Sequence, residues 1–282
     1  MQTLPFEPPV RPACVLERHA VVEVPLSEIQ ALRDVPVPVG APALPPRFLR
    51  HCDEQTVVGV RAVLEALACE PAAPRSLARD GVIAAPRLAG RITAAQTLAQ
   101  VATAGDVAVS PHVVPQCSLH ALASAVSVAL GMHGPNFGTS GGPEALSEGL
   151  FTALSLVQTA GCDRLWLVLT EWDEEPVLDA AGRPGNDPLC RALALALAPC
   201  TAAEPVGIGL TLRSATQRGC EPAAASGPGP GLAAFTAALA LAGDGGVIAS
   251  WSHICPWGAE IRITAPAAVA VAAPPHVRRE AA

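Results

Sequence analysis

The sequence of this 282-residue chain predicts a layered α/β protein. Apolar positions at helical spacing alternate along the chain with short runs that are apolar on both faces, the pattern of strands covered by helices on each side. Half of the residues are apolar and only 15% are charged, which excludes a disordered chain. A chain of this length buries roughly 75% of its unfolded surface, enough for one large domain or two small ones.

The charge and the cysteine content of the chain limit which binding partners, metals and cofactors it could have. The net charge of −7, without a long basic run, argues against nucleic acid and anionic membranes as partners. All 18 basic residues are arginine, so chemistry that needs a lysine is excluded. The nine cysteines are dispersed and form no Cys-X-X-Cys pair, which fits reduced thiols better than disulfides or a zinc site. We therefore expect no metal and no cofactor.

Two further features predict a soluble, cytoplasmic protein. The longest apolar stretches, near 121–131 and 232–243, are too short to span a bilayer. The first residues contain no cationic segment followed by an apolar one, so they do not resemble a secretory signal.

The first elements follow from apolar spacing and from proline. Residues 1–46 are rich in proline and contain a short strand-like run over 19–24. Apolar positions at helical spacing predict helices over 55–68 and 93–104. A buried strand is expected over 81–85.

The middle of the chain predicts a strand over 106–110, closed by Pro111, and then a helix over 119–130. This helix is built of small residues and has no polar face, so it is either buried centrally or part of a subunit interface. The candidate interface residues are Ala121, Ser124, Ala125, Val128 and Phe137.

A glycine-bearing turn over 134–142 leads directly into an amphipathic helix whose first predicted positions are Pro143 and Glu144. Many enzymes hold a reactive Ser or Cys at such a point, under the positive end of the helix dipole. Proline is equally favoured at the first turn of an ordinary helix, where its missing N–H costs nothing. The residues alone favour this structural interpretation.

The next elements are a central strand over 164–170 and a helix that Asp187 and Pro188 cap and Pro199 ends. A strand over 206–212, a link over 219–231 and a helix carrying Leu232, Phe235 and Leu239 follow, before closing strands over 247–251 and 259–263. The predicted organisation is a proline-rich N-terminal segment, a core, an abbreviated second α/β unit and a loose tail, at 1–46, 47–200, 201–265 and 266–282.

The order of these motifs resembles that of β-ketoacyl synthases. A Ser110-Pro111 turn, a small-residue helix and a Gly134-Pro135-Asn136 turn follow one another as in the N-terminal half of that family. The segments 142–150 and 170–176 resemble more closely the short β-ketoacyl synthase N-terminal-like proteins of aryl-polyene and xanthomonadin-type pigment pathways. The resemblance covers 47–200, and 249–263 is similar to a degraded closing hairpin. It implies a thiolase-like αβαβα architecture with a truncated C-terminal half.

The resemblance also implies that the condensation chemistry of the family is lost. Alignment on the Gly-Pro-Asn turn puts Pro143 at the position of the nucleophilic cysteine. Proline supplies neither the thiol nor the N–H that helps to bind the oxyanion in the family. The supporting lysine and a His-Gly-Thr-Gly-Thr segment are also missing. We therefore expect no independent condensing activity.

Other residues offer weaker candidates for chemistry. Cys117 and His120 are three positions apart and could form a thiolate–imidazole pair, although a buried structural thiol is the simpler interpretation. His253 and Cys255 lack a visible third partner. An acidic cluster could hold a cation but lacks the spacing of a calcium loop and is more typical of a solvated loop; it comprises Glu171, Asp173, Glu174 and Glu175.

Three functions remain open from the sequence. The first is a catalytically silent ketosynthase-like subunit, comparable to a chain-length factor, that pairs with a complete ketosynthase and helps to shape the acyl tunnel. The second is a stand-alone acyltransferase or thioesterase that uses Cys117 and His120. The third is a non-enzymatic module that docks an acyl carrier protein, for which only Arg47, Arg50 and Arg61 offer a basic surface.

Overall fold

The computed structural model describes residues 13–69, 75–200, 207–214, 231–243 and 251–264, together with the backbone of 277–278. Its strands form one mixed sheet in the order β3-β2-β4-β5-β1-β6-β8-β7, with β9 paired to β1. The strands are β1 (Cys14–Pro25), β2 (Gly81–Pro86), β3 (Asn136–Gly138), β4 (Leu165–Asp173), β5 (Leu189–Pro199), β6 (Ile208–Ser214), β7 (Ser252–Ile254), β8 (Ala259–Thr264) and β9 (Val277–Arg278).

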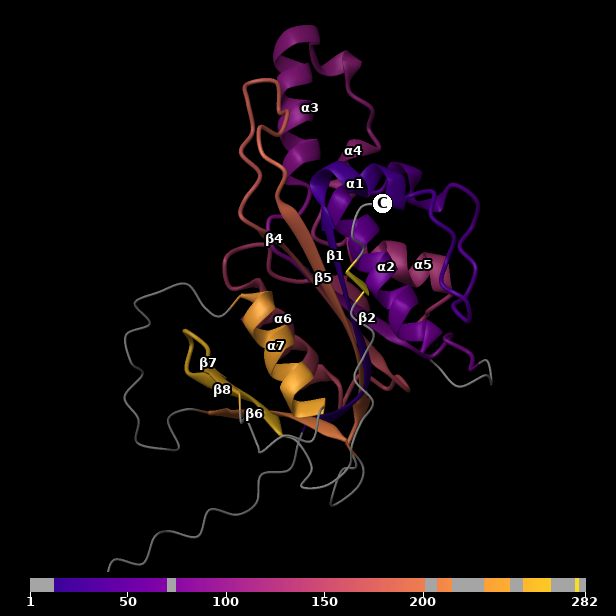
Figure 1. The fold of residues 1–282 in the computed structure, drawn as a ribbon, viewed down its shortest axis with the longest axis vertical. Helices are drawn as coiled ribbons and strands as arrows, with labels where there is room; N and C mark the ends of the chain where they lie inside the picture. Colours follow the sequence, from indigo (N-terminus) through magenta and orange to yellow (C-terminus); the bar gives the residue numbers. More distant parts are fainter. Residues whose placement is uncertain are drawn as a thin grey trace, which may run out of the picture.

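Helices cover both faces of this sheet (Figure 1). The helices are α1 (Leu26–Leu32), α2 (Glu54–Ala68), α3 (Arg91–Ala104), α4 (Val113–Gln116), α5 (Ala121–Leu130), α6 (Ala145–Leu156) and α7 (Leu232–Gly243), with short 3-10 turns η1 (Phe48–His51) and η2 (Asp106–Ala108). Helices α1, α2 and α5 pack on one face, and α6 and α7 pack on the other. The predicted α/β class is confirmed, and the described residues form three layers: helix, sheet and helix.

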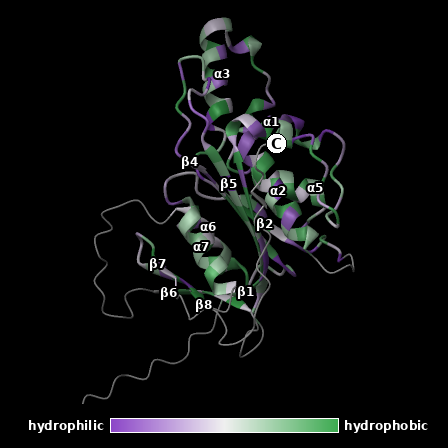
Figure 2. Cartoon of the chain, viewed as in Figure 1, coloured by the Kyte–Doolittle hydropathy of each residue, from purple (hydrophilic) through white to green (hydrophobic). Residues whose placement is uncertain are grey.

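The central strands explain why both faces are apolar. Along β5, residues at even positions from Cys190 to Ala196 join the core beneath α2, whereas Leu193, Leu195 and Leu197 join the core beneath α6 and α7. The strand is therefore buried on both sides, and the hydrophobic colouring of the central strands in Figure 2 follows from that position. Two separate cores are built on the one sheet.

The helix expected after Asp187 is wrong, because this segment is strand β5. Leucines at 189, 193 and 197 fit helical spacing, but together with Leu195 they also follow the period of two that a strand requires. Antiparallel pairing with β1 on one side and β4 on the other decides the conformation. Tertiary hydrogen bonding overrides the helical preference of the alanines here.

Two other sequence expectations need correction. Residues 106–110 form the turn η2 and a largely exposed loop instead of a strand, since they lie on a projecting part of the chain where the described residues offer no neighbouring strand. Helix α6 begins at Ala145, so Pro143 precedes the helix and Glu144 is its N-cap.

The remaining described elements agree with the sequence. The predicted helices near 55–68, 93–104, 119–130 and 232–239 are α2, α3, α5 and α7, and the strands near 81–85, 164–170, 206–212 and 259–263 are β2, β4, β6 and β8. The run near 19–24 is part of the longer β1, which lies inside the sheet and pairs with β5, β6 and β9. The link at 219–230, most of the strand at 247–251 and most of the tail lie outside the described residues. The four-part division of the chain stays a prediction.

Helix α3 differs from the others because it projects from the body of the molecule (Figure 1). Ile92 is its only buried residue. Its sequence carries no charged residue between Arg91 and Asp106, yet Leu98 is 69% exposed and Val101 39% exposed. We refer to residues 91–117, from the start of α3 to the C-cap of α4, as the arm.

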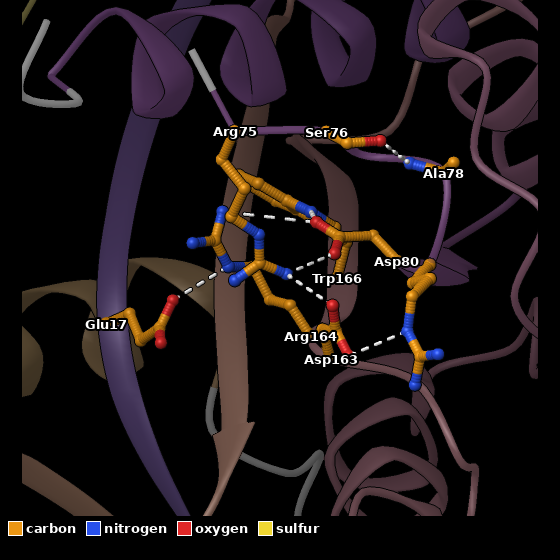
Figure 3. Close-up of polar contacts among 9 residues, drawn as sticks. Glu17, Arg75, Ser76, Ala78, Asp80, Asp163, Arg164 and Trp166 are labelled. Atoms are coloured by element: carbon orange, nitrogen blue, oxygen red, sulfur yellow. Dashed lines mark hydrogen bonds and ion pairs between the residues drawn. The ribbon is translucent and has the colours of Figure 1, made fainter. Parts of the chain in front are cut away.

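A buried charge network holds the sheet at the starts of β2 and β4 (Figure 3). The carboxylate of Asp80, fully buried, accepts hydrogen bonds from Arg75 Nη2 at 2.6 Å and Trp166 Nε1 at 3.0 Å. Arg164 lies 3.9 Å from the same carboxylate and donates to Glu17 on β1 at 2.7 Å. Burial raises the pKa of Asp80, and these donors oppose that rise. The network lies at the end of the sheet opposite the start of α6, so we assign it a structural role.

Candidate functional site

The glycine-bearing turn before α6 is shaped by close backbone packing. A Cβ atom on Gly138 would lie 2.0 Å from the carbonyl oxygen of Leu119, and one on Gly141 would lie 2.6 Å from the Leu119 side chain. The N–H of Thr139 donates to the carbonyl of Ala84 at 2.8 Å, which aligns the turn with β2. These glycines are thus required by the approach of the segment before α5, and they form no phosphate-binding loop.

The loops that meet at this turn contain strained backbone. Ser140 and Leu88 both adopt positive φ angles, of 70° and 61°, which are unfavourable for residues with side chains. The N–H of Leu88 donates to the carbonyl of Gly141 at 3.0 Å and so joins the two loops. Such strain persists only where neighbouring contacts fix the backbone. The carboxyl end of β2 is therefore a tightly constrained part of the fold.

Pro143 faces a cavity of only about 20 Å³. The walls come from the carboxyl ends of β2 and β4, the first residues of α6 and the start of α7. A space of this size holds about one water molecule. Pro143 itself is exposed at the edge of this space.

The start of helix α7 forms one wall of this cavity, and Glu171 caps that helix. The backbone N–H of Leu232 donates to Glu171 Oε1 at 2.9 Å, and a carboxylate at a helix N-terminus is favourable. Arg87 lies 4.0 Å from the same carboxylate, and Arg191 lies 3.5 Å from it. This ion cluster ties β4, β5 and α7 together beside Pro143.

A polar cluster that the sequence did not predict lies on the first turn of α6. The hydroxyl of Ser147 lies 2.9 Å from Nε2 of His253 on β7 and 3.3 Å from Oε2 of Glu144. Burial lowers the pKa of His253, and the charge of Glu144 partly opposes that change. A neutral imidazole beside a serine hydroxyl is a base and nucleophile pair by composition. Ser147, however, is only 2% exposed, so we interpret the contact as a structural link.

Cys255 completes this cluster and is equally enclosed. It is 1% exposed, and burial, followed by the charge of Glu144, raises the pKa of its thiol to about 11. The sequence showed His253 and Cys255 but no third partner, because Ser147 and Glu144 lie more than 100 positions away along the chain. The only sequence signal was a Glu followed three residues later by a Ser at a helix start.

The predicted pair of Cys117 and His120 is not formed. Cys117 ends α4, whereas His120 is the exposed N-cap of α5, and no hydrogen bond joins them in the part of the chain described. Burial raises the pKa of the Cys117 thiol, and the charge of Asp53 adds to this effect. Cys117 instead packs on Gly90, where a Cβ atom would lie 2.7 Å from the Cys117 Cα.

The acidic cluster after β4 faces arginines instead of one another. Asp173 lies 3.5 Å from Arg191, and Glu175 forms a 2.7 Å ion pair with Arg91. Within the described ranges, no three His, Cys, Asp or Glu side chains gather as metal ligands would. The absence of a cofactor stays a prediction.

Four of the five predicted interface residues line one groove beside α5. The groove has a volume of about 280 Å³ and runs between η1, the end of the arm and α5. Val128 at its edge is 67% exposed, and Val114 on the arm is 72% exposed. Phe137 lies apart, on the edge strand β3, and packs against the core beneath α6. The four residues in the groove are Ala121, Ser124, Ala125 and Val128.

Of the helices described here, none has the length and apolarity needed to cross a bilayer.

No protein-family model and no curated protein matches this chain. Several solved structures do. The ishigamide ketosynthase/chain length factor is 17% identical with a TM-score of 0.46, over 72% of this chain and 68% of that chain. A ketosynthase (ApeO) in complex with its chain length factor (ApeC) from Xenorhabdus doucetiae is 20% identical with a TM-score of 0.44, over 71% and 84%. A β-ketoacyl synthase from Burkholderia phymatum is 16% identical with a TM-score of 0.46, over 73% and 65%.

These matching structures are of the class that the sequence motifs resemble, ketosynthases and ketosynthase/chain-length-factor proteins. At identities of 20% or less, the likeness carries no residue role and no ligand over to this chain.

Proposed function

We propose that this chain is a catalytically silent β-ketoacyl synthase-like subunit that pairs with an active ketosynthase in a fatty-acid or polyketide type of pathway, of the aryl-polyene kind. The observation that carries the proposal is Pro143 at the aligned nucleophile position, where proline supplies neither a thiol nor a backbone N–H. The order of motifs over 47–200 supplies the family. The chain would contribute surface and shape to the complex, and its partner would contribute the chemistry.

The surroundings of each candidate nucleophile support the proposal that this chain has no catalytic activity of its own. Pro143 has no reactive group, Ser147 is enclosed, and Cys117 has a raised thiol pKa and, among the described residues, no hydrogen bond to His120. The acyltransferase or thioesterase alternative based on Cys117 and His120 therefore loses its main support. Docking of an acyl carrier protein stays a prediction.

A pairing role is supported by the exposed apolar surface around α5. The groove is continuous with the arm, which also exposes Leu98, Val101, Val107 and Val114. Exposed apolar patches mark interaction sites in soluble proteins. The small residues on α5 would let a partner helix or strand approach closely.

Co-expression with a β-ketoacyl synthase from the same genome tests the proposal. We expect a stable heterodimer on size-exclusion chromatography with light scattering, and condensation that needs the active-site cysteine of the partner. Val128→Asp should weaken the heterodimer on the order of tenfold or more, because an unpaired carboxylate would be buried in the interface.

Val177→Asp is the matched control, since Val177 is 65% exposed but lies on the loop before β5. Circular dichroism establishes that both variants fold. Two species that elute separately would overturn the pairing, and an equal effect of both substitutions would overturn the assigned surface. Condensation catalysed by this chain alone would overturn the proposal that it is catalytically silent.

A further inference from the structure

A cationic hollow lies on the opposite side of η1 from the groove. It has a volume of about 310 Å³ and is lined by Gln30, Arg33, Asp34, Arg47 and Arg50. Three arginines and one aspartate give the lining a net charge of +2 (3 − 1), in a chain whose overall charge is −7. Positive charge is therefore concentrated in this hollow, although the chain as a whole carries a net negative charge.

Arg33 builds the wall of the hollow. It is half-buried, and its Nε donates to Gln30 Oε1 at 3.0 Å on α1. Its Nη1 donates to the carbonyls of Leu49 and Cys52, the latter at 2.7 Å. These bonds hold the end of α1 against η1. The backbone on both sides of the hollow is therefore fixed in place.

Arg47 and Arg50 supply the uncompensated charge. Arg47 is the N-cap of η1 and Arg50 is its third residue, and the N–H of Arg50 donates to the carbonyl of Arg47 at 3.0 Å. Both side chains are exposed, and neither has a carboxylate within 4.0 Å among the described residues. Arg47 is also held at a φ of 60°, a conformation that costs energy for a residue with a side chain.

The two faces of η1 therefore differ in chemistry. Phe48 and His51 line the apolar groove, whereas Arg47 and Arg50 line the cationic hollow. The guanidinium fork matches the oxygens of a phosphate in a bidentate manner. A concave space near 300 Å³ is at the small end of the range for small-molecule sites, which favours a small ligand over the broad face of an acidic protein.

We propose that this hollow binds the phosphate group of a small phosphate monoester, held by Arg47 and Arg50 and positioned by Arg33. The inference is independent of pairing with a ketosynthase and of the state of Pro143.

Calorimetric titration of the full chain with inorganic phosphate and with phenyl phosphate tests it, with phenol as the probe that lacks the phosphate. Saturable binding of both phosphates, but not of phenol, is expected. The double variant Arg47→Gln/Arg50→Gln should weaken phosphate binding on the order of tenfold or more, because two charged donors are lost. Arg183→Gln removes an equally exposed arginine far from the hollow and should leave the affinity unchanged.

Three results would overturn the proposal: no saturable binding at several millimolar phosphate, an equal loss of affinity in Arg183→Gln, or binding of an acidic carrier protein at these arginines without binding of either phosphate. Circular dichroism and the unfolding midpoint of the double variant establish that its fold is intact.

Discussion

The hydroxyl of Ser147 on the first turn of α6 lies 2.9 Å from Nε2 of His253 on β7, although 106 positions separate the two residues. This hydrogen bond joins the last hairpin of the described chain to the helix that begins beside Pro143. The T-shaped contact between Phe151 and Trp257, with ring centroids 5.8 Å apart, supports the same junction. The hairpin is therefore fastened to α6 by one polar and one aromatic contact.

The first prediction concerns His253 and pH. Burial lowers its pKa below the ordinary 6.5, so the stability that the neutral ring contributes is full above pH 6.5 and is lost as the pH falls through the folded-state pKa. His253→Gln should cost about 1 kcal/mol at neutral pH, and its difference from the wild type should shrink as the pH falls. Urea unfolding across this range measures the effect.

His112→Gln is the control for this measurement, because His112 is exposed on the arm. The titratable groups that face His253 are Glu144 and Cys255. A His253→Gln difference that does not change with pH would contradict the assignment.

The second prediction concerns Asp53, the N-cap of α2. Its carboxylate accepts a hydrogen bond from the N–H of Thr56 at 3.2 Å, while burial raises its pKa from 3.8 to about 6. Stability linked to this group is full below pH 3.8 and is lost as the pH rises through about 6. Asp53→Asn keeps the capping oxygen and stays neutral.

This variant should therefore gain stability relative to the wild type as the pH rises from about 4 to 7, by up to about 3 kcal/mol. Chemical unfolding at several pH values measures the gain. Asp106→Asn, at an exposed position of the arm, should show no comparable gain. A gain for Asp53→Asn that is the same at every pH would sink the prediction.

The third prediction concerns the packing of α6 on the sheet. A Cβ atom on Gly149 would lie 2.6 Å from the Ala85 Cβ and 3.0 Å from the Leu169 side chain. Gly149→Ala should lower the free energy of unfolding by about 1–3 kcal/mol, because the helix must move away from β2 and β4. Gly243→Ala on α7 meets open space and should cause no loss, since alanine favours a helix. Equal effects in thermal unfolding would refute this account.

The fourth prediction concerns restoration of the missing thiol. Pro143→Cys returns both a sulfur and a backbone N–H, but the cavity beside it has a volume of only about 20 Å³ and the chain has no lysine to support the chemistry. We expect no acyl adduct in intact-mass spectrometry after incubation with acyl-CoA, and no condensation with a malonyl thioester. An adduct that disappears in Pro143→Ser would show that this position accepts an acyl group, and the small cavity and missing lysine would then no longer explain the lack of activity.

The sequence located much of the sheet and many of the helices that cover it. Helix α2 and strand β4 were predictable because their residues are buried almost throughout, so the local pattern and the environment agree. Strand β5 was not, since its leucines fit helical and strand spacing equally well. The segment at 106–110 was predicted as a strand but lies in solvent, because no strand of the described sheet is next to it to pair with it.

The candidate site, like the fold, was predictable from the sequence only in part. The sequence by itself determined that proline occupies position 143 and that the chain has no lysine, because these are facts of composition and order. The tertiary structure decided that the start of α7 lies beside Pro143, that Ser147 contacts His253, and that arginines gather next to η1. These contacts join residues distant in the chain, and the sheet that brings them together is set by long-range pairing that no local pattern encodes.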